Sequence, residues 1–309
     1  MIGVDIYTKP GADTWRGTFN FGFRDEAVGA RNVFAPVRGP EQYRRFGLAL
    51  DGPVWANHTS LFLVVDGTNS YDSKTIVAAL PDGLFNDVLR RPSRTLNLSA
   101  RVEHALTKSH TLRAEYQHNG GRQDNLGAGD FDLPDRAYST RQTEQIFRFS
   151  DTGLLTHRLV NELRFQTRWQ NTESSSATHS PALIVLNAFS RGGAQIQSDR
   201  HIRDVELADN IDMAFGLHSI KTGISIEAKT YDTRELRNGD GTFIFANLDS
   251  FRAARPTTFS RRAGDPRVAF TQYELGWYLQ DDMRLAKSLT LSFGVRQEGQ
   301  NHLADHNNF

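Results

Sequence analysis

Apolar and polar residues alternate along most of the chain. Between Thr14 and Arg24, every second residue from Trp15 onward is an aromatic residue or a glycine, and most of the residues between them are polar. Neighbouring side chains of a β-strand point to opposite faces, so this segment is predicted to be a strand with one apolar and one charged face. The same period recurs in residues 95–103, 110–118, 158–170, 220–231, 273–280 and 289–298.

Weaker signals complete the pattern. Asn161 and Asp209 break it, because both occupy positions where an apolar residue is expected. Two short helical turns are predicted, one over residues 84–89 ahead of Pro92 and one over residues 248–254. Less regular alternation brings the count to about eleven strands; it covers residues 45–52, 59–68, 138–150 and 203–215.

Long and short connections alternate between the predicted strands. In transmembrane β-barrels, short periplasmic turns alternate with long extracellular loops, whereas a soluble meander has no reason to place every long loop at one end. The pattern predicts an all-β fold, a transmembrane antiparallel up-and-down β-barrel, to which this chain supplies about eleven strands. The long connections are residues 25–43, 69–93, 119–137, 171–202 and 232–267, and the short ones are 53–58, 106–109, 151–155, 216–219 and 285–288.

Aromatic residues near the strand ends support this assignment. If the short turns are periplasmic, the first strand runs outward, and six aromatic residues of the apolar rows fall near the two membrane boundaries. Amphipathic rings prefer the headgroup level, so such girdles are typical of these barrels. The predicted girdles are Trp15, Phe149 and Phe215 at the inner boundary and Tyr116, Trp169 and Tyr273 at the outer one.

Composition excludes several classes of protein. The 309 residues carry 36 basic and 36 acidic side chains, so the net charge is zero and no basic excess points to a nucleic-acid partner. Cysteine is absent, which excludes disulfides and cysteine-ligated metals. The longest plainly apolar stretch, residues 61–65, is far shorter than the about 20 residues of a spanning helix. A helical membrane protein is therefore excluded.

The two ends of the chain are also informative. Residues 1–10 lack a basic segment followed by an apolar core, so no signal peptide is present. This favours either a cytoplasmic protein or one whose start is missing. Phe309 matches the terminal aromatic residue of many outer-membrane barrels, but Asn307 and Asp305 precede it at the same period, so coincidence is favoured.

Several motifs near the start of the chain belong together. Residues 2–11, then Trp15-Arg16-Gly17 and residues 19–24, resemble the junction between plug and barrel in TonB-dependent outer-membrane transporters. Residues 30–35, ARNVFA, are similar to the Oar-like subfamily of that family. The pair Phe46-Gly47 with residues 51–54 resembles the family's second strand and turn.

The most specific motif lies near the end of the chain. Residues 278–282, YLQDD, followed by residues 289–291 and 294–296, resemble a characteristic strand pair of the same subfamily. Met283 stands where that motif usually has tryptophan. Residues 239–248 and 264–266 resemble the loop that precedes this strand pair.

The resemblance covers most of the chain and implies a function. It implies a barrel in the outer membrane of a Gram-negative bacterium that imports a large or scarce ligand, with energy supplied by contact with TonB. Such transporters close at about 22 strands around a plugged lumen, so about eleven strands would form a partial barrel. Residues 1–13 would end a plug and residues 14–309 would form the N-terminal half of the barrel. The implied partners are outer-membrane lipid, the TonB complex through a missing N-terminal region, and an unidentified extracellular ligand.

No motif predicts an enzyme, a cofactor or a metal site. The HExxH, P-loop, GxSxG and EF-hand patterns are absent, and the ten histidines are scattered. Asp281 and Asp282 are neighbours on a strand and point to opposite faces, so they cannot act on one bond. Asp130, Asp132 and Asp135 offer carboxylates to a calcium ion, but their spacing matches no known cage and a solvated loop is favoured.

Two sets of residues are candidates for contact with a plug or a ligand. Charged residues on the strands are predicted to line a wet lumen, where a wall that holds a plug is favoured over direct ligand contact; they are Arg164, Arg168, Lys221, Glu227, Lys229, Glu274, Arg296 and Glu298. Aromatic residues of the predicted loops are candidates to grip a ligand, since loops carry binding function; they are Tyr71, Phe131, Tyr138, Phe189, Phe243 and Phe251.

Two other functions remain open. A soluble secreted β-sandwich or propeller that binds carbohydrate would bury each apolar row in its own core. A passive porin-like or adhesion barrel would have the same wall without TonB coupling.

Overall fold

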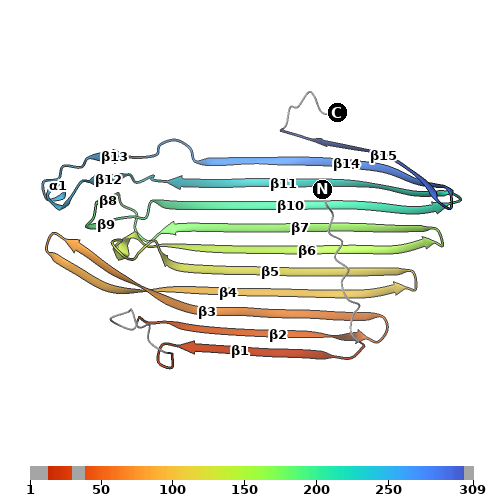
Figure 1. The fold of residues 1–309 in the computed structure, drawn as a ribbon, viewed down its shortest axis with the longest axis horizontal. Coiled ribbons are helices and arrows are strands. Elements are labelled where there is room, and N and C mark those ends of the chain that lie inside the picture. The colour runs from red at the N-terminus through yellow and green to blue at the C-terminus, as the bar shows by residue number, and fades with distance from the viewer. Residues whose placement is uncertain (1–12, 30–38, 303–309) are drawn as a thin grey trace.

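Eleven long strands form one antiparallel sheet, in which each strand pairs with the strands before and after it (Figure 1). The computed structural model describes residues 13–29 and 39–302. The sheet confirms the predicted all-β meander of about eleven strands. Its strands are β1 (Arg16–Asp25), β2 (Gln42–Trp55), β3 (Thr59–Leu80), β4 (Gly83–Thr107), β5 (His110–Leu126), β6 (Tyr138–Thr156), β7 (Leu159–Ser176), β10 (Ile196–Phe215), β11 (His218–Arg237), β14 (Arg267–Ala286) and β15 (Leu289–Gln300).

The two ends of the sheet differ. Five short turns lie at one end, on the right of Figure 1, and connect β2 to β3, β4 to β5, β6 to β7, β10 to β11 and β14 to β15. The remaining connections lie at the opposite end. The predicted alternation of short and long connections is therefore confirmed along the sheet, with one exception. The exception is the connection between β3 and β4.

The connection between β3 and β4 is where the prediction was wrong. Residues 69–93 are not a loop, and residues 84–89 are not helical, because both strands continue to a tight turn beyond the end of their neighbours. The apolar pairs Leu84-Phe85 and Val88-Leu89 are four positions apart, which is the spacing of one face of a helix. In a strand, the two members of each pair point to opposite faces, so the same residues also fit a strand. This segment forms a strand because it pairs with β3, where Phe85 lies opposite Ala78.

The connections after β5, β7 and β11 fold into a compact layer at their end of the sheet (Figure 1). A four-stranded sheet in the order β13-β12-β8-β9 forms part of it, and the predicted helix near residues 248–254 is confirmed as α1. We call these elements, together with the tip of the β3–β4 hairpin, the cap. They are η1 (Pro134–Arg136), β8 (Ala182–Val185), β9 (Phe189–Arg191), β12 (Thr242–Phe245), α1 (Leu248–Arg252) and β13 (Thr258–Ser260).

The cap holds the main buried apolar cluster of the described residues. This cluster consists of Ile76, Ala78, Leu133, Val185, Ala188, Phe189 and Phe245. Along the strands, by contrast, large apolar side chains are exposed: Phe19 to 72%, Ile226 to 45% and Leu291 to 50%. No second sheet covers this apolar face in the described part of the chain, so the sandwich and propeller alternatives do not fit.

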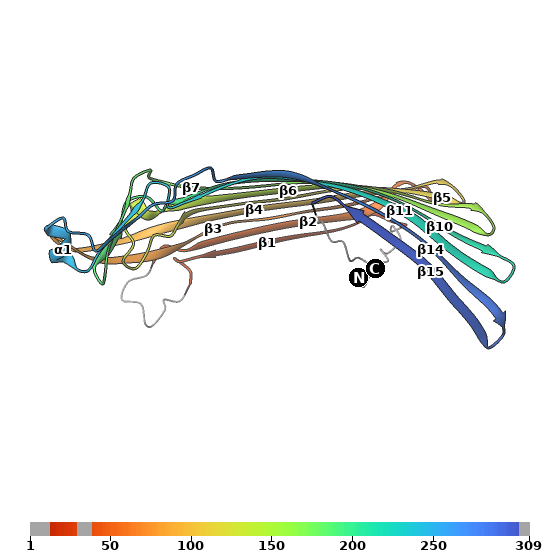
Figure 2. The same ribbon diagram turned by 90° about the horizontal axis from the view of Figure 1, so that it is seen from above.

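The sheet is curved and open. Figure 2 shows the curvature along the strands and across the sheet. β1 and β15 are its two edges and do not pair with each other. No helix among the described residues is long and apolar enough to cross a membrane.

Some sequence predictions fall outside the described residues. The predicted end of the plug at residues 1–13 does so apart from Asp13, as do the motif at residues 30–35 and Phe309.

Candidate functional site

The charged face of the sheet carries all eight residues that were predicted to line a lumen. They come from β7, β11, β14 and β15, and the cross-strand register places them all on the face opposite the apolar rows. Arg168, for example, lies opposite Asp204, which lies opposite Lys229. That this face lines a lumen stays a prediction.

Ion pairs connect neighbouring strands on this face. The Arg168 guanidinium lies 3.3 Å from the Asp204 carboxylate and 3.8 Å from that of Glu144, so it links β6, β7 and β10. Each pair is partly exposed, so its contribution to stability is small, and its main effect is to fix the side chains. Further pairs that the sequence did not single out join Arg113 to Glu103 (2.6 Å) and Arg148 to Glu115 (3.3 Å).

Three glutamates form a row on the same face. Glu206 of β10 lies directly opposite Glu227 of β11, which lies directly opposite Glu274 of β14. None of the three makes an ion pair with a described residue. Like charges directly opposite one another destabilise a sheet, so a further cationic group beside this row would stabilise it. Glu206 was missed because its strand alternates only weakly.

Three of the six predicted ligand-gripping aromatic residues pack inside the cap. Phe189 is only 1% exposed, and its ring centroid lies 5.2 Å from that of Phe251 in an edge-to-face contact. Phe251 makes a second such contact with Phe245, also at 5.2 Å. Phe243 packs against Phe259 with ring centroids 4.4 Å apart. These rings hold the cap together in this structure.

The other three predicted aromatic residues are differently placed. Phe131, between β5 and β6, is 55% exposed. Tyr138 is half-buried at the start of β6. Tyr71 lies within β3, where the Arg90 guanidinium sits 5.0 Å from the centre of its ring. Of the six rings, that of Phe131 is plainly exposed, and contact of any of them with a ligand stays a prediction.

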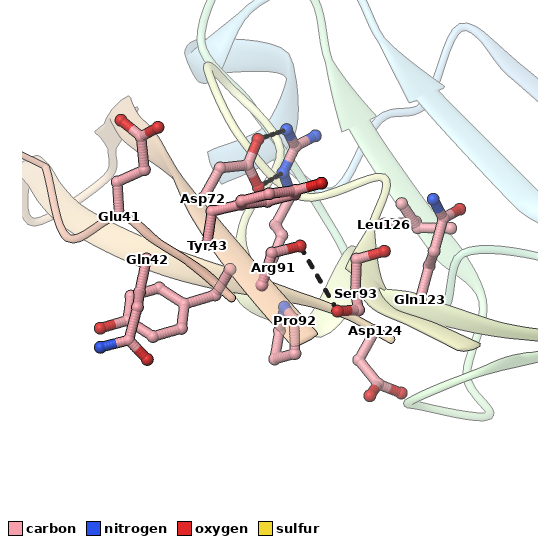
Figure 3. Close-up of a pocket in the computed structure, with 12 residues that line it drawn as sticks. Glu41, Gln42, Tyr43, Asp72, Arg91, Pro92, Ser93, Gln123, Asp124 and Leu126 are labelled. Atoms are coloured by element: carbon pink, nitrogen blue, oxygen red, sulfur yellow. Dashed lines mark hydrogen bonds and ion pairs between the residues drawn. The ribbon is translucent and has the colours of Figure 1, made fainter. Parts of the chain in front are cut away.

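A hollow of about 380 Å³ opens at the cap end of β2 to β5 (Figure 3). Inside it, Asp72 and Arg91 form a two-pronged ion pair, with Arg91 Nε donating to Asp72 Oδ1 at 3.1 Å. The hydroxyl, amide and carboxylate groups that line the hollow suit a polar ligand. The lining residues are Glu41, Gln42, Tyr43, Ser70, Tyr71, Asp72, Arg91, Pro92, Ser93, Gln123, Asp124 and Leu126.

The acidic residues of the β5–β6 connection are engaged with the protein. Asp135 accepts a hydrogen bond from the Gly192 backbone N–H at 2.9 Å, and the Asp132 carboxylate lies 3.8 Å from the Arg136 guanidinium. No group of three or more metal-ligating side chains is present among the described residues.

Polar pairs interrupt the apolar face of the sheet. Asn161 donates to the Asp209 carboxylate at 2.6 Å, which explains the two breaks in the sequence pattern. His218 Nδ1 lies 2.6 Å from Asp281 Oδ2 on the same face. Asp282 faces the other way, as the sequence predicted.

Comparisons with known proteins place the chain in a family. The family model described as "Outer membrane beta barrel domain" matches residues 83–309. No curated protein matches the chain.

Solved structures share the fold at low sequence identity. The outer membrane transporter YddB from Escherichia coli is 12% identical with a TM-score of 0.62, over 87% of this chain and 35% of that one. The ferric enterobactin receptor PfeA from Pseudomonas aeruginosa is 13% identical with a TM-score of 0.51, and the match covers 95% of this chain and 40% of the receptor. The ferric citrate transporter FecA is 11% identical with a TM-score of 0.52, and the match covers 95% of this chain and 39% of the transporter.

The chain thus spans between about a third and two-fifths of the length of these transporters and receptors. Its open sheet, apolar on one face and charged on the other, corresponds to a section of a barrel wall. The chain belongs to the outer membrane beta-barrel domain family, and it lies in the outer membrane of a Gram-negative bacterium.

Proposed function

We propose that the chain is part of a TonB-dependent outer-membrane transporter that imports a large or scarce ligand. The observation that carries this proposal is the curved sheet, which is apolar and exposed on one face and charged on the other, with every long connection gathered at one end. A wall of this kind separates lipid from a wet interior. The solved structures with the same fold are named as transporters and receptors, which supports a transport function over an enzymatic one.

The finer assignment rests on sequence motifs. Residues 278–282 on β14, with the strand pair β14–β15 that follows, favour the Oar-like subfamily. On this proposal, residues 1–13 end the plug and residues 14–309 form the N-terminal half of the barrel.

The charged face is the proposed contact with the plug. A row of three glutamates across β10, β11 and β14 supports this role, because none of them forms an ion pair with a described residue and a cationic group of the plug would relieve their mutual repulsion. The eight predicted charged residues and the ion pairs between strands would form the rest of the wall.

The hollow at the cap end is the proposed contact with the ligand. Tyr71 lines it, and the exposed ring of Phe131 lies in the same layer of connections. A ligand with several hydrogen-bonding groups fits a lining of this composition.

TonB coupling can be tested without knowing the ligand. The full-length protein, purified in detergent, would be titrated with the periplasmic domain of TonB in a calorimeter. The proposal predicts saturable binding that disappears when the segment ahead of Met1 is deleted. A folded full-length protein that shows no binding would contradict it.

A passive porin-like barrel is the remaining alternative. Planar bilayers separate the two, because a plugged transporter gives no steady conductance whereas a porin gives stable open channels. Stable channels from the intact protein would favour the porin.

A further inference from the structure

Three arginines lie side by side on the apolar face of the sheet, at its cap end. Arg94 of β4 is directly opposite Arg122 of β5, which is directly opposite Arg141 of β6. All three side chains are exposed. Like charges directly opposite one another destabilise a sheet, so the row is unfavourable unless something else neutralises it.

The described residues supply only part of the needed negative charge. Arg122 Nε donates to both carboxylate oxygens of Asp124, at 2.9 and 3.1 Å. The side chains of Arg94 and Arg141 make no hydrogen bond or ion pair with any described residue. Glu173 is the residue opposite Arg141 on β7, but the two side chains form no ion pair. Two guanidinium groups therefore remain free beside one that is already held.

A hollow of about 510 Å³ lies next to this row. Its floor is Gly120, which sits between Leu96 and Thr143 in the adjacent register row and leaves a gap where a side chain would stand. A Cβ at Gly120 would lie 3.0 Å from His118 Nε2, so even a small side chain would crowd the site. The arginines form one rim of the hollow, and His118 and Gln145 form the other.

The apolar rows begin directly beside the hollow. Leu96 is the outward-facing residue next to Arg94 on β4 and is 45% exposed. Further toward the short-turn end, Ala100, Tyr116 and Phe147 share one register row on the same face. A molecule that filled the hollow would therefore have a phosphate-sized anionic group at the arginines and an apolar part along the strands.

We propose that Arg94, Arg122 and Arg141 bind the phosphorylated headgroup of a lipid of the outer leaflet. Guanidinium groups form paired, charge-assisted hydrogen bonds with phosphate oxygens, and arginines near a membrane surface are attracted to anionic lipid. A free phosphate ion would use the arginines but would leave the neighbouring apolar rows without a partner. The proposal depends on the location of the chain in the outer membrane and is independent of which ligand is imported.

The test uses the full-length protein and a diphosphorylated glucosamine lipid, lipid A, in mixed detergent micelles. Bound lipid would be counted by native mass spectrometry over a range of lipid concentrations. Arg94→Gln combined with Arg141→Gln removes both free guanidinium groups, and we expect the lipid to bind about 30-fold more weakly. Lipid A without its phosphates should bind with the same low affinity to both proteins.

A matched control removes two other arginines from the same face. Arg203 and Arg234 are exposed on β10 and β11, and neither belongs to the row of three. Arg203→Gln combined with Arg234→Gln removes the same charge and should leave lipid A binding within about twofold of the original.

Three results would overturn the proposal. One is equal loss of binding in the control, which would mean that only net charge matters. Another is unchanged binding in the variant without Arg94 and Arg141. The last is full competition by inorganic phosphate at millimolar concentration, which would identify a site for the free ion. If the double variant does not fold, the single changes Arg94→Gln and Arg141→Gln provide the same comparison, each with a smaller expected loss.

Discussion

At the scale of single residues, the polar side chains on the apolar face are held in pairs. Asn161 and Asp209 lie 48 positions apart in the chain and meet because β7 pairs with β10. The sequence identified both as exceptions to the alternation, but it contained no signal that the two exceptions meet. Only the register of the sheet brings the amide to the carboxylate.

This pairing leads to a prediction. Asn161→Leu leaves the Asp209 carboxylate on the lipid-facing side without the amide that donates to it at 2.6 Å. We expect the free energy of unfolding, measured in urea, to fall by about 1–3 kcal/mol. The change Asn161→Leu with Asp209→Leu removes both partners and should restore most of the loss. The full-length protein in lipid vesicles is the material for both measurements. Equal stabilities of the single and double variants would show that the pair is not coupled.

At the scale of elements, the long strands were predictable and the cap was not. Alternation with a period of two is a local signal, so it revealed the strands of the large sheet. The cap depends on contacts between distant segments: β8 pairs in parallel with β12, and Phe189 of one connection packs against Phe251 of another. For the same reason, the loop aromatic residues could be named from the sequence, but their burial could not.

Phe189 tests the structure of the cap. Phe189→Ala removes a ring that is 1% exposed in the main apolar cluster, and a change of this kind costs about 3–5 kcal/mol. We expect faster hydrogen exchange in residues 182–191 and 242–252, with the strands of the large sheet unchanged. Phe131→Ala is the matched control, because that ring is 55% exposed and its loss should leave exchange in the cap as it is. Unchanged exchange after Phe189→Ala would contradict the packing described here.

At the scale of the whole molecule, the chain is a section of wall with two free edges. β1 and β15 each leave one edge without a partner strand, and the apolar face has no protein cover among the described residues. Unpaired edges and exposed apolar rows promote association between chains. The neutral net charge of the 309 residues adds no repulsion to oppose it.

The behaviour of the isolated chain follows from these features. Expressed alone in the cytoplasm, the 309 residues should collect in inclusion bodies and, after refolding without detergent, should elute as large aggregates in size-exclusion chromatography. A stable, monodisperse monomer without detergent would show that the apolar rows are covered, which the open sheet does not allow.

On this assignment, one face of the sheet contacts lipid and the other faces a wet interior. β11 tests it directly, because Ile224 and Ile226 lie on one face while Ser225 and Glu227 lie on the other. The chain has no cysteine, so each position can be changed to cysteine in turn and labelled with a nitroxide at a unique site in this chain. Paramagnetic resonance of the full-length protein in vesicles then measures how often each label collides with oxygen, which concentrates in lipid, and with a water-soluble nickel chelate.

Accessibility along β11 should alternate with a period of two. Labels at Ile224→Cys and Ile226→Cys should collide mainly with oxygen, and labels at Ser225→Cys and Glu227→Cys mainly with the nickel chelate. Equal accessibility along the strand, or the opposite alternation, would contradict it.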